Sequence, residues 1–335
     1  MFVTARLLFV YREPAPFVKA DRALLARHYT VIDFSWQGRK HPARDLASWM
    51  LKNRDKYDIV FVWFGDSHAT VASLASLVAG RPTIIQVGGY DVSDLADYGF
   101  LAWRRNRGMA RVHFRLAARI LAVSDELAEE IARRFPSAEP KIRVLPTGVD
   151  SSRFRPQGPR RQQVLSVAFV DSWRRAWIKG WDLLAAAARE APNISFLLIG
   201  ASDSVRARLA GPKNLEVRGP VEQGELISAY QASEVYAQPS RAEGLPNALL
   251  EAMASGCVPV VTRIGGMTNL VEGTGFVVEA EPASIARAIA DAIRSPEIGD
   301  RARARVVEKY PLANRDRRLC EQVEQVLSRR LSDLP

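Results

Sequence analysis

Residues 238–261 read QPSRAEGLPNALLEAMASGCVPVV, and this stretch decides the fold of the second half of the chain. A buried strand ends near Gln238, and a short polar loop containing Glu243 and Gly244 follows it. The apolar spacing then predicts a helix over residues 245–255, with Pro246 in its first turn, where proline is tolerated. The apolar run 258–262 is expected to form the next strand. A strand, a helix and another strand in this order are typical of a parallel α/β sheet.

The start of this helix is suited to a phosphate group. In an open α/β sheet it directs its free amides, those near Leu245 and Asn247, out of the carboxyl edge, where such sheets bind ligands. Glu243 lies beside these amides, and Glu251 lies about two turns further along the helix. Each carboxylate can accept hydrogen bonds from two adjacent hydroxyls. A nucleotide sugar presents two such pairs of hydroxyls, one at each end of its diphosphate.

The rest of the chain repeats this rhythm in two halves. Short apolar runs that read as buried parallel strands alternate with longer amphipathic segments that read as helices. Strands are expected at residues 7–11, 30–34, 58–64, 83–87, 119–123 and 142–145 in the first half, and at 163–169, 194–199, 215–218, 235–238, 258–262 and 275–278 in the second. This pattern predicts two doubly wound, Rossmann-like α/β domains.

A polar, turn-rich segment at residues 146–159 marks the connector between the two halves. We therefore expect a first domain over residues 1–150 and a second over residues 160–311. The final segment, 301–331, is charged and helical in pattern. It either closes its own domain or, as a helix over about 312–335, crosses back to the first domain.

The composition is globular, with 335 residues, of which 47% are hydrophobic and 25% charged. No window approaches the roughly 18 uninterrupted apolar residues of a membrane-spanning helix. The apolar run near the N-terminus is interrupted by Arg6, and it reads as a buried first strand instead of a secretion signal. Two distant cysteines, Cys257 and Cys320, suit the reducing cytoplasm, where we expect the protein to be found. Neither they nor the four scattered histidines have metal-ligand spacing, so no metal site is expected.

The net charge of +10 has a local source between Tyr98 and Ser124, where no acidic residue occurs. The arginines of this stretch are Arg104, Arg105, Arg107, Arg111, Arg115 and Arg119, and Trp103, Phe114 and Leu116 interleave with them. On a helix they form a basic flank beside an apolar one, which suits peripheral attachment to an anionic membrane through residues 103–119. The alternative is a solvated arginine face whose side-chain stems cover the core. The same field attracts nucleic acid, which we do not expect as a partner.

Several segments resemble a known family. PSRAEGLPNALLEAMASGCVPVVTRIGG (239–266) is similar to the signature of retaining glycosyltransferases of the GT-B fold, group 4. LAVSDELAEEIARRF (121–135) and KIRVLPTGVDSSRF (141–154) resemble the family's approach to its interdomain connector. VRGPVEQGELISAYQASEVYAQPS (217–240) and TGFVVEAEPASIARAIADAI (274–293) resemble its nucleotide-side strands and closing helix. The resemblance covers most of residues 119–293, and it implies two domains that face a cleft.

The resemblance implies a role for each donor-side residue. Glu243 would hold hydroxyls of the donor sugar, Glu251 would hold the ribose, and Lys179 would meet the diphosphate and stabilise the departing charge. The backbone of Gly244, Leu245, Pro246 and Asn247 would face sugar and phosphate, although Pro246 has no N–H, and the backbone near Val221 would face the base. The family's Gly-Arg-Leu context is replaced by Ala168-Phe169-Val170. Either Arg174, which we favour slightly, or Arg175 would supply the missing guanidinium.

The first domain departs more from the family. Its first loop, residues 11–16, lacks the double glycine that many relatives have there. Gly88 and Gly89 after the fourth strand would supply the close backbone approach instead, so that Tyr90 and Asp91 face the acceptor. His68, in the loop after the third strand, is another acceptor-side candidate, although such a histidine is about as often structural.

The function expected from this resemblance is transfer of a sugar, with retained configuration, from a nucleoside-diphosphate sugar to a hydroxyl of a glycan or lipid-linked glycan. Neither a metal nor a cofactor is required. A glycoside hydrolase is disfavoured because its two carboxylates must flank the scissile bond. A nicotinamide oxidoreductase is disfavoured because no G-x-G-x-x-G follows the first strand. The alternative of another class is a non-catalytic nucleotide- or glycan-binding protein that keeps the fold.

Overall fold

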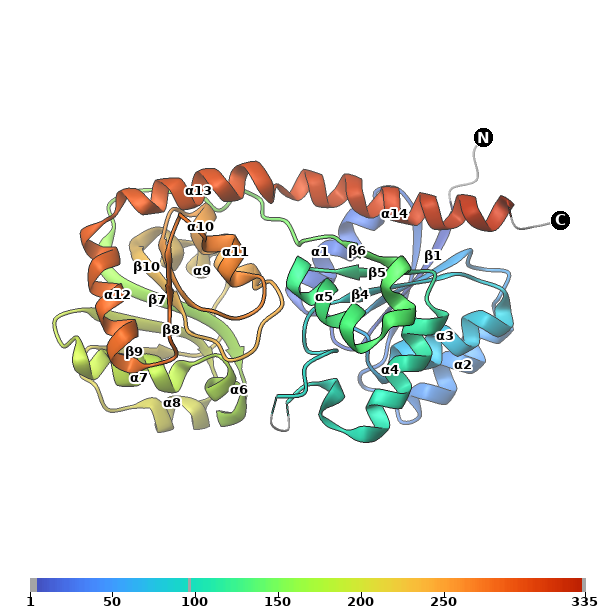
Figure 1. The fold of residues 1–335 in the computed structure, drawn as a ribbon, viewed down its shortest axis with the longest axis horizontal. Helices are drawn as coiled ribbons and strands as arrows, with labels where there is room; N and C mark the ends of the chain where they lie inside the picture. The colour runs from blue at the N-terminus through green and yellow to red at the C-terminus, as the bar shows by residue number, and fades with distance from the viewer. Residues whose placement is uncertain (1–4, 96–97, 333–335) are drawn as a thin grey trace. The chain divides into compact units, whose positions relative to one another are not determined.

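The computed structural model describes residues 5–95 and 98–332, which form two compact units (Figure 1). The first unit comprises Met1–Thr147 together with Ala313–Pro335, and the second comprises Gly148–Leu312. Met1–Thr4, which begin the N-terminal apolar run, lie outside the described residues. None of the described helices has the length and apolar character that crossing a membrane requires.

The first unit is a six-stranded parallel sheet covered by helices. Its elements are β1 (Arg6–Tyr11), α1 (Pro16–Leu25), β2 (Thr30–Ser35), α2 (Pro42–Lys52), β3 (Ile59–Trp63), α3 (Ser67–Ala79), β4 (Thr83–Val87), η1 (Phe100–Ala102), α4 (Arg104–Leu116), β5 (Arg119–Ala122), α5 (Asp125–Arg134), η2 (Pro136–Lys141), β6 (Ile142–Val144) and α14 (Leu312–Ser332). The strand order is β2-β1-β3-β4-β5-β6. Every residue of β3 and β4 is buried, because central parallel strands are covered on both faces.

The second unit repeats this architecture with the other common strand order. Its elements are β7 (Arg161–Val170), α6 (Trp173–Ile178), α7 (Trp181–Glu190), β8 (Ser195–Ala201), α8 (Asp203–Leu209), β9 (Leu215–Arg218), α9 (Gln223–Ala232), β10 (Ser233–Gln238), α10 (Asn247–Ala254), β11 (Val258–Thr262), α11 (Met267–Val271), β12 (Phe276–Val278), α12 (Pro282–Arg294) and α13 (Glu297–Lys309). The order β12-β11-β10-β7-β8-β9 is that of a dinucleotide-binding sheet. The predicted fold class, two doubly wound α/β units, is therefore confirmed.

The predicted helix over residues 245–255 was wrong at its start. Helix α10 begins at Asn247, and Pro246 precedes it with an extended ψ of 122°, so proline lies outside the first turn. The Pro246 carbonyl instead accepts the first hydrogen bond of the helix, from the Leu249 amide at 3.1 Å. A residue before the helix needs no helical ψ, which explains why the loop extends two residues further than the apolar pattern indicates.

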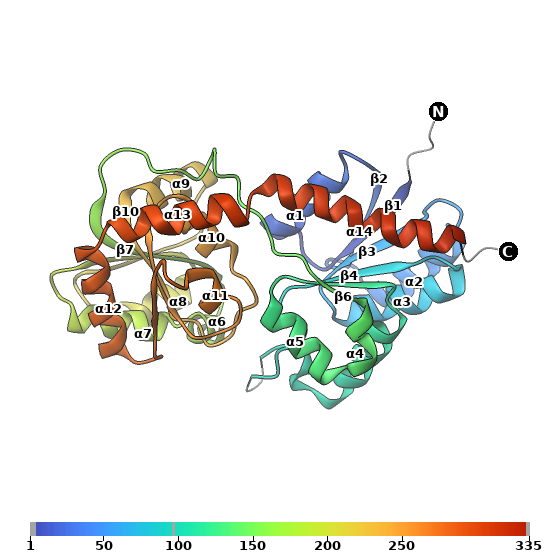
Figure 2. The same cartoon turned by 45° about the horizontal axis from the view of Figure 1, so that its top comes forward.

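The C-terminal segment both closes the second unit and returns to the first, the two alternatives that the sequence left open. Helix α13 packs on α10 within the second unit, and α14 belongs to the first unit except for Leu312 (Figures 1 and 2). The break falls at Tyr310 and Pro311, where proline cannot continue a helix. The expected helix over 312–335 ends at Ser332 in the described chain, and residues 333–335 lie outside it.

A buried ion pair ties α14 to the first unit. Arg315, 2% exposed, donates to both carboxylate oxygens of Asp21 on α1, at 3.0 and 2.6 Å. It also donates to the Leu145 carbonyl at 2.6 Å and to Gln86 Oε1 at 2.7 Å. Trp63 Nε1 completes the shell of Asp21 at 2.8 Å. The guanidinium thus has a partner in almost every direction, which is the condition for burying a charge.

Candidate active site

The second unit has a topological switch point between β7 and β10. The chain leaves β7 for β8 on one side, whereas β10 lies on the other, so the loops after β7 and β10 diverge at the carboxyl edge. Open α/β sheets bind ligands at such a point. Lys179 follows α6 after β7, and Glu243 follows β10. Their side chains meet there, with Lys179 Nζ 2.6 Å from Glu243 Oε1.

Glu243 accepts three hydrogen bonds on one oxygen. Besides Lys179, Gln238 Nε2 donates to Oε1 at 2.7 Å and Ser240 Oγ donates to it at 2.9 Å. The side chain of Glu243 is 9% exposed and that of Lys179 is 23% exposed. The carboxylate is therefore held rigidly near the surface, with its second oxygen, Oε2, outside this set of bonds.

Gly180 allows the lysine loop to approach β10. Its φ of +70° is left-handed, and a Cβ there would lie 2.0 Å from the Pro239 carbonyl oxygen. Any other residue at this position would be strained and would clash. Lys179 is consequently placed by a glycine that brings two loops of the switch point together.

The loop into α10 offers unsatisfied backbone donors. Gly244, Leu245 and Pro246 are buried, and Gly266 donates its amide to the Gly244 carbonyl at 2.9 Å, which fixes the loop. Across the part of the chain that the structure describes, the amides of Gly244, Leu245 and Asn247 have no acceptor. Free amides at a helix N-terminus attract anions.

Glu251 lies in α10 against α9. Tyr230 Oη donates to Glu251 Oε2 at 3.0 Å, and Tyr230 is fully buried. Burial raises the pKa of the Glu251 carboxyl from its ordinary 4.5 to about 7, and the Tyr230 hydrogen bond and the charge of Arg153 only partly oppose this. Near neutral pH this group is close to half protonated.

The raised pKa of Glu251 makes the stability of the second unit depend on pH. Between about pH 4.5 and 7 the folded protein still binds this proton, whereas the unfolded chain has lost it. The free energy of unfolding therefore falls as the pH rises through this range. The contribution is fully present below about pH 4.5, is lost by about pH 7, and amounts to about 3 kcal/mol at most. Urea unfolding of wild type and Glu251→Gln across this range should show a smaller pH slope in the variant.

The comparison isolates Glu251 because other titrating groups are present in both proteins. Asp91, whose pKa burial raises to about 6, is one of them. Glutamine keeps an acceptor for Tyr230, so the variant should fold. Identical slopes for the two proteins would contradict the assignment of this pKa.

The two candidate arginines lie on α6, one turn before Lys179. Arg175 pairs with Asp171 at 3.4 Å, and its guanidinium lies 5.6 Å from the centre of the Phe169 ring. The Arg174 guanidinium lies 5.0 Å from the Trp177 ring. Val221 lies in the loop after β9, also at the carboxyl edge of the sheet. Both guanidinium groups thus lie beside aromatic rings.

The sequence interpretation missed three polar residues of this site. Gln238 and Ser240 orient Glu243, as described above. Arg241 forms a two-pronged ion pair with Asp182, at 2.8 Å for each contact, and stacks 4.5 Å from the Trp177 ring. Gln238 is the last residue of β10, and Ser240 and Arg241 follow it closely. Polar residues at a strand's carboxyl end were therefore the available signal.

In the first unit, Asp91 holds the loop after β4 from within. It is fully buried, and its oxygens accept the amides of Gly65 at 3.0 Å, Gly88 at 3.1 Å and Gly89 at 2.7 Å. The expectation that Asp91 faces an acceptor is therefore not met by its position, because its carboxylate is turned into backbone. A Cβ on Gly88 would lie 2.7 Å from the Phe64 ring, so glycine is needed for this approach.

His68 is also turned inward. It is fully buried, with Nδ1 2.5 Å from Asp66 Oδ1 and Nε2 2.7 Å from the Trp63 carbonyl oxygen. Arg12 lies 3.6 Å from the other oxygen of Asp66. His68 lies in the first turn of α3 and not in a loop, as the sequence had suggested. Both hydrogen-bond partners of its ring are acceptors, so it orders the turn between β3 and α3 and does not itself reach solvent.

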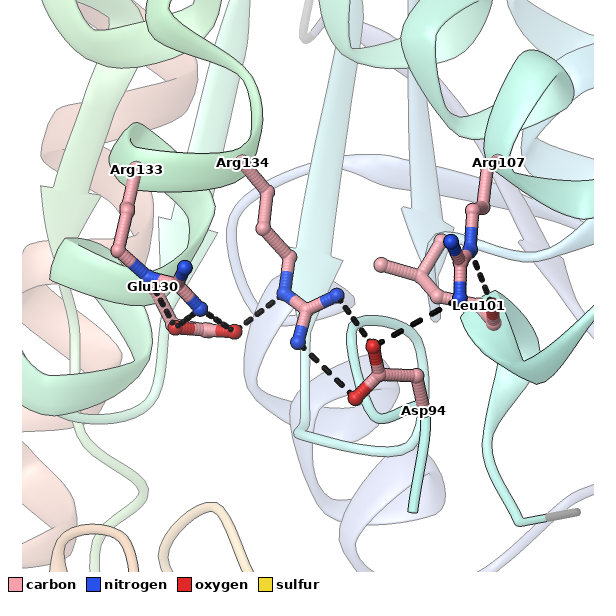
Figure 3. A network of polar contacts seen from close by, with 6 residues as sticks. All are labelled: Asp94, Leu101, Arg107, Glu130, Arg133 and Arg134. Carbon is pink, nitrogen blue, oxygen red and sulfur yellow. Dashed lines mark hydrogen bonds and ion pairs between the residues drawn. The ribbon is translucent and has the colours of Figure 1, made fainter. Parts of the chain in front are cut away.

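Tyr90, by contrast, is 36% exposed on a loop that a charged network anchors. Arg134 of α5 donates to both oxygens of Asp94 at 2.8 and 3.0 Å, and Arg107 of α4 lies 3.8 Å from Asp94 (Figure 3). Arg107 also donates to the Leu101 carbonyl at 2.9 Å. The pKa of Asp94 is lowered mainly by its hydrogen bond from Arg134. The loop that carries Tyr90 is thereby tied to two helices.

Among the described residues, one group has the ligand types of a metal site, namely His28, Asp316 and Cys320 of the first unit. Asp316 already binds the Arg27 guanidinium and the His28 ring, each at 3.2 Å. Burial raises the pKa of the Cys320 thiol to about 11, which disfavours the thiolate that binds metals. This group is explained as an ion-pair cluster between the end of α1 and α14.

Comparison with known proteins agrees with these features. The family model for glycosyltransferase family 4 matches residues 6–153, and that for glycosyl transferases group 1 matches residues 165–295. A mannosyltransferase of Corynebacterium glutamicum, described as GDP-mannose-dependent and acting on a monoacylated phosphatidylinositol monomannoside, is 29% identical over 285 residues, covering 74% of this chain and 72% of its own. A putative teichuronic acid biosynthesis glycosyltransferase of Bacillus subtilis is 27% identical, covering 77% and 69%.

Solved structures share the fold at low sequence identity. Anabaena HepE in complex with UDP has a TM-score of 0.76 at 17% identity, covering 96% of this chain and all of that one. A sucrose-phosphate synthase from Thermosynechococcus elongatus has a TM-score of 0.78 at 16% identity, covering 97% and 99%. With two family models matched across both units, and with the parallel sheets of the GT-B fold, the chain belongs to the family 4 glycosyltransferases.

Proposed function

We propose that the protein transfers a sugar from a nucleoside-diphosphate sugar to a hydroxyl of a glycan or lipid-linked glycan, with retained configuration. The contact of Lys179 with Glu243 at the switch point carries this proposal. Glu243 would accept hydrogen bonds from donor-sugar hydroxyls, and Lys179 would neutralise the diphosphate as it leaves. The relatives' descriptions, which name GDP-mannose or UDP, support a nucleotide donor.

The geometry of α10 and of the loops near it supports the remaining donor contacts. The free amides of Gly244, Leu245 and Asn247 would receive the diphosphate and the sugar, and Glu251 would accept the ribose hydroxyls. The backbone near Val221 would face the base. Arg174 or Arg175, which lie side by side on α6, would take the second cationic role.

The reaction would need no general base from the protein. The acceptor hydroxyl attacks the anomeric carbon, the bond from that carbon to the β-phosphate oxygen breaks, and the hydroxyl proton passes to this oxygen. Lys179 and the helix amides stabilise the charge that develops there, so neither a metal nor a cofactor is required. Tyr90 and the Gly88-Gly89 backbone of the first unit would bind the acceptor. We expect the enzyme to work in the cytoplasm.

A donor panel tests the proposal. Incubation with UDP-, GDP- and ADP-sugars should release nucleotide with one of them, in the presence or absence of EDTA. Lys179→Met should reduce turnover about a hundredfold, because it removes a cation aimed at the developing phosphate charge. Lys213→Met, an exposed lysine of the same unit, is the matched control and should match wild type.

Two outcomes would contradict the proposal in different ways. Calorimetric binding of a nucleoside diphosphate without turnover of any donor would favour a non-catalytic binding protein. Loss of turnover in EDTA that added metal restores would contradict metal independence.

A further inference from the structure

Helix α3 presents an apolar surface to solvent. Its sequence, SHATVASLASLVA, contains no Asp, Glu, Lys or Arg. Leu74, Leu77 and Val78 are 47%, 63% and 71% exposed. A helix at the surface of a soluble protein normally turns charged or polar residues outward, and an outward face of leucine and valine calls for a partner.

The neighbouring helix α4 supplies the opposite chemistry. The Thr70 hydroxyl on α3 lies 3.3 Å from the Met109 carbonyl oxygen and 2.9 Å from His113 Nδ1, so the two helices pack together. Leu74 and Leu77 follow Thr70 at helical spacing and lie on the same side of α3. On α4, Val112 follows Met109 by about one turn and is 36% exposed. We refer to Leu74, Leu77 and Val112 together as the apolar strip.

A row of arginines borders this strip. Arg104, Arg111 and Arg115 recur at helical spacing on the exposed side of α4, and Arg105 is exposed beside them. Among the described residues, none of these four has an acidic side chain within 4.0 Å. Arg107 differs, since it lies 3.8 Å from Asp94. Arg119, expected in this basic segment, is 1% exposed in β5 and donates to Gln325, so it takes no part.

We propose that the exposed face of α3 and the arginine row of α4, together the α3–α4 face, dock on an anionic lipid bilayer. The leucines and valines would enter the boundary between headgroups and acyl chains, and the arginines would contact lipid phosphates. This proposal goes beyond sugar transfer, since it assigns the enzyme to a membrane surface. It also replaces the single-helix basic segment expected from the sequence by a two-helix surface.

The charge pattern favours lipid over a second copy of the chain. A two-fold contact brings the same patch of both copies together. It would bring the arginine rows of both copies into the same contact, where like charges repel. An anionic bilayer would bury the apolar strip and pair the arginines with phosphates at the same time.

Flotation with lipid vesicles tests the α3–α4 face. Wild type should float with phosphatidylcholine vesicles that contain phosphatidylglycerol, more strongly at low than at high salt. Leu74→Gln with Leu77→Gln should weaken partitioning at least about tenfold, because glutamine keeps helix propensity but loses apolar burial. Arg111→Gln with Arg115→Gln should weaken it about 25-fold, which corresponds to about fivefold per arginine.

Matched controls lie in the second unit. Val307→Gln, at a site 38% exposed on α13, and Arg287→Gln with Arg301→Gln, both exposed, should float as wild type does. Glu243→Gln should float normally as well, which separates docking from catalysis. If the double leucine variant unfolds, Val78→Gln alone should still weaken binding.

Three results would overturn the proposal. The first is failure of wild type to float with anionic vesicles at low salt. The second is flotation of the α3 variants that is no weaker than that of Val307→Gln. The third is a light-scattering result in which the α3 variants turn a dimer into a monomer, which would mean that a second copy covers this face.

Discussion

Glu243→Gln is expected to reduce turnover about a thousandfold while leaving the protein folded. Its Oε1 atom accepts from Lys179, Gln238 and Ser240, and a glutamine oxygen can accept the same three bonds. What glutamine loses is the negative charge that Lys179 pairs with and that donor hydroxyls would bind. Groups that act on the developing charge of a transition state are typically worth about 10²–10³ in rate each, and here two would be disturbed at once.

The measurement is the initial rate with the donor that the panel identifies, at saturating donor concentration. Glu279→Gln, at an exposed position of the same unit, controls for the loss of one negative charge and should keep full activity. A Glu243→Gln enzyme within tenfold of wild type would remove Glu243 from the reaction, and with it the proposed donor site.

Arg315→Met is expected to lower the free energy of unfolding of the first unit by about 3–5 kcal/mol. Methionine fills much of the space, but Asp21 keeps a buried charge with only the Trp63 indole as its described side-chain partner. Gln86 Oε1 and the Leu145 carbonyl also lose their donor. Removing one member of a buried ion pair costs more than the pair contributes, because the other charge stays uncompensated.

Denaturant titration with a probe in the first unit measures this effect, since two units need not unfold together. Arg317→Met, two residues further on α14, breaks an exposed pair with Glu321 and should cost less than about 1 kcal/mol. Adding Asp21→Asn to Arg315→Met should recover part of the loss, because the stranded charge is removed. Equal stabilities of the two arginine variants would contradict the buried-pair account.

The strands were predictable because each is a short apolar run that must be buried. All twelve expected strands occur, and β4, β9 and β11 keep the expected bounds. Long-range pairings were not predictable in this way. Arg315 and Asp21 are both ordinary helix-surface residues in the sequence, and only the path of α14 makes them a buried pair. Likewise, Arg119 belongs to a basic run yet faces inward, because β5 is a buried strand.

Some features of the candidate site were likewise predictable from the sequence and others were not. The resemblance pointed to Lys179 and Glu243, and the structure places their side chains in contact. The inward turn of Asp91 and His68 was hidden, because a sequence does not tell whether a loop carboxylate binds ligand or backbone. Tyr90 is exposed, and its anchor, the Arg134–Asp94 pair, joins residues from separate elements.

The membership of α14 in the first unit also affects the order in which the two units can complete their folding. Arg315 leaves the ribosome after the whole second unit, whereas its partner Asp21 is synthesised before that unit. The first unit therefore waits for its last helix while the second, built from the continuous stretch Gly148–Leu312, can fold as it emerges. During that interval Asp21 lacks its guanidinium, so a nascent chain stalled before residue 315 should be sensitive to proteases in its N-terminal part.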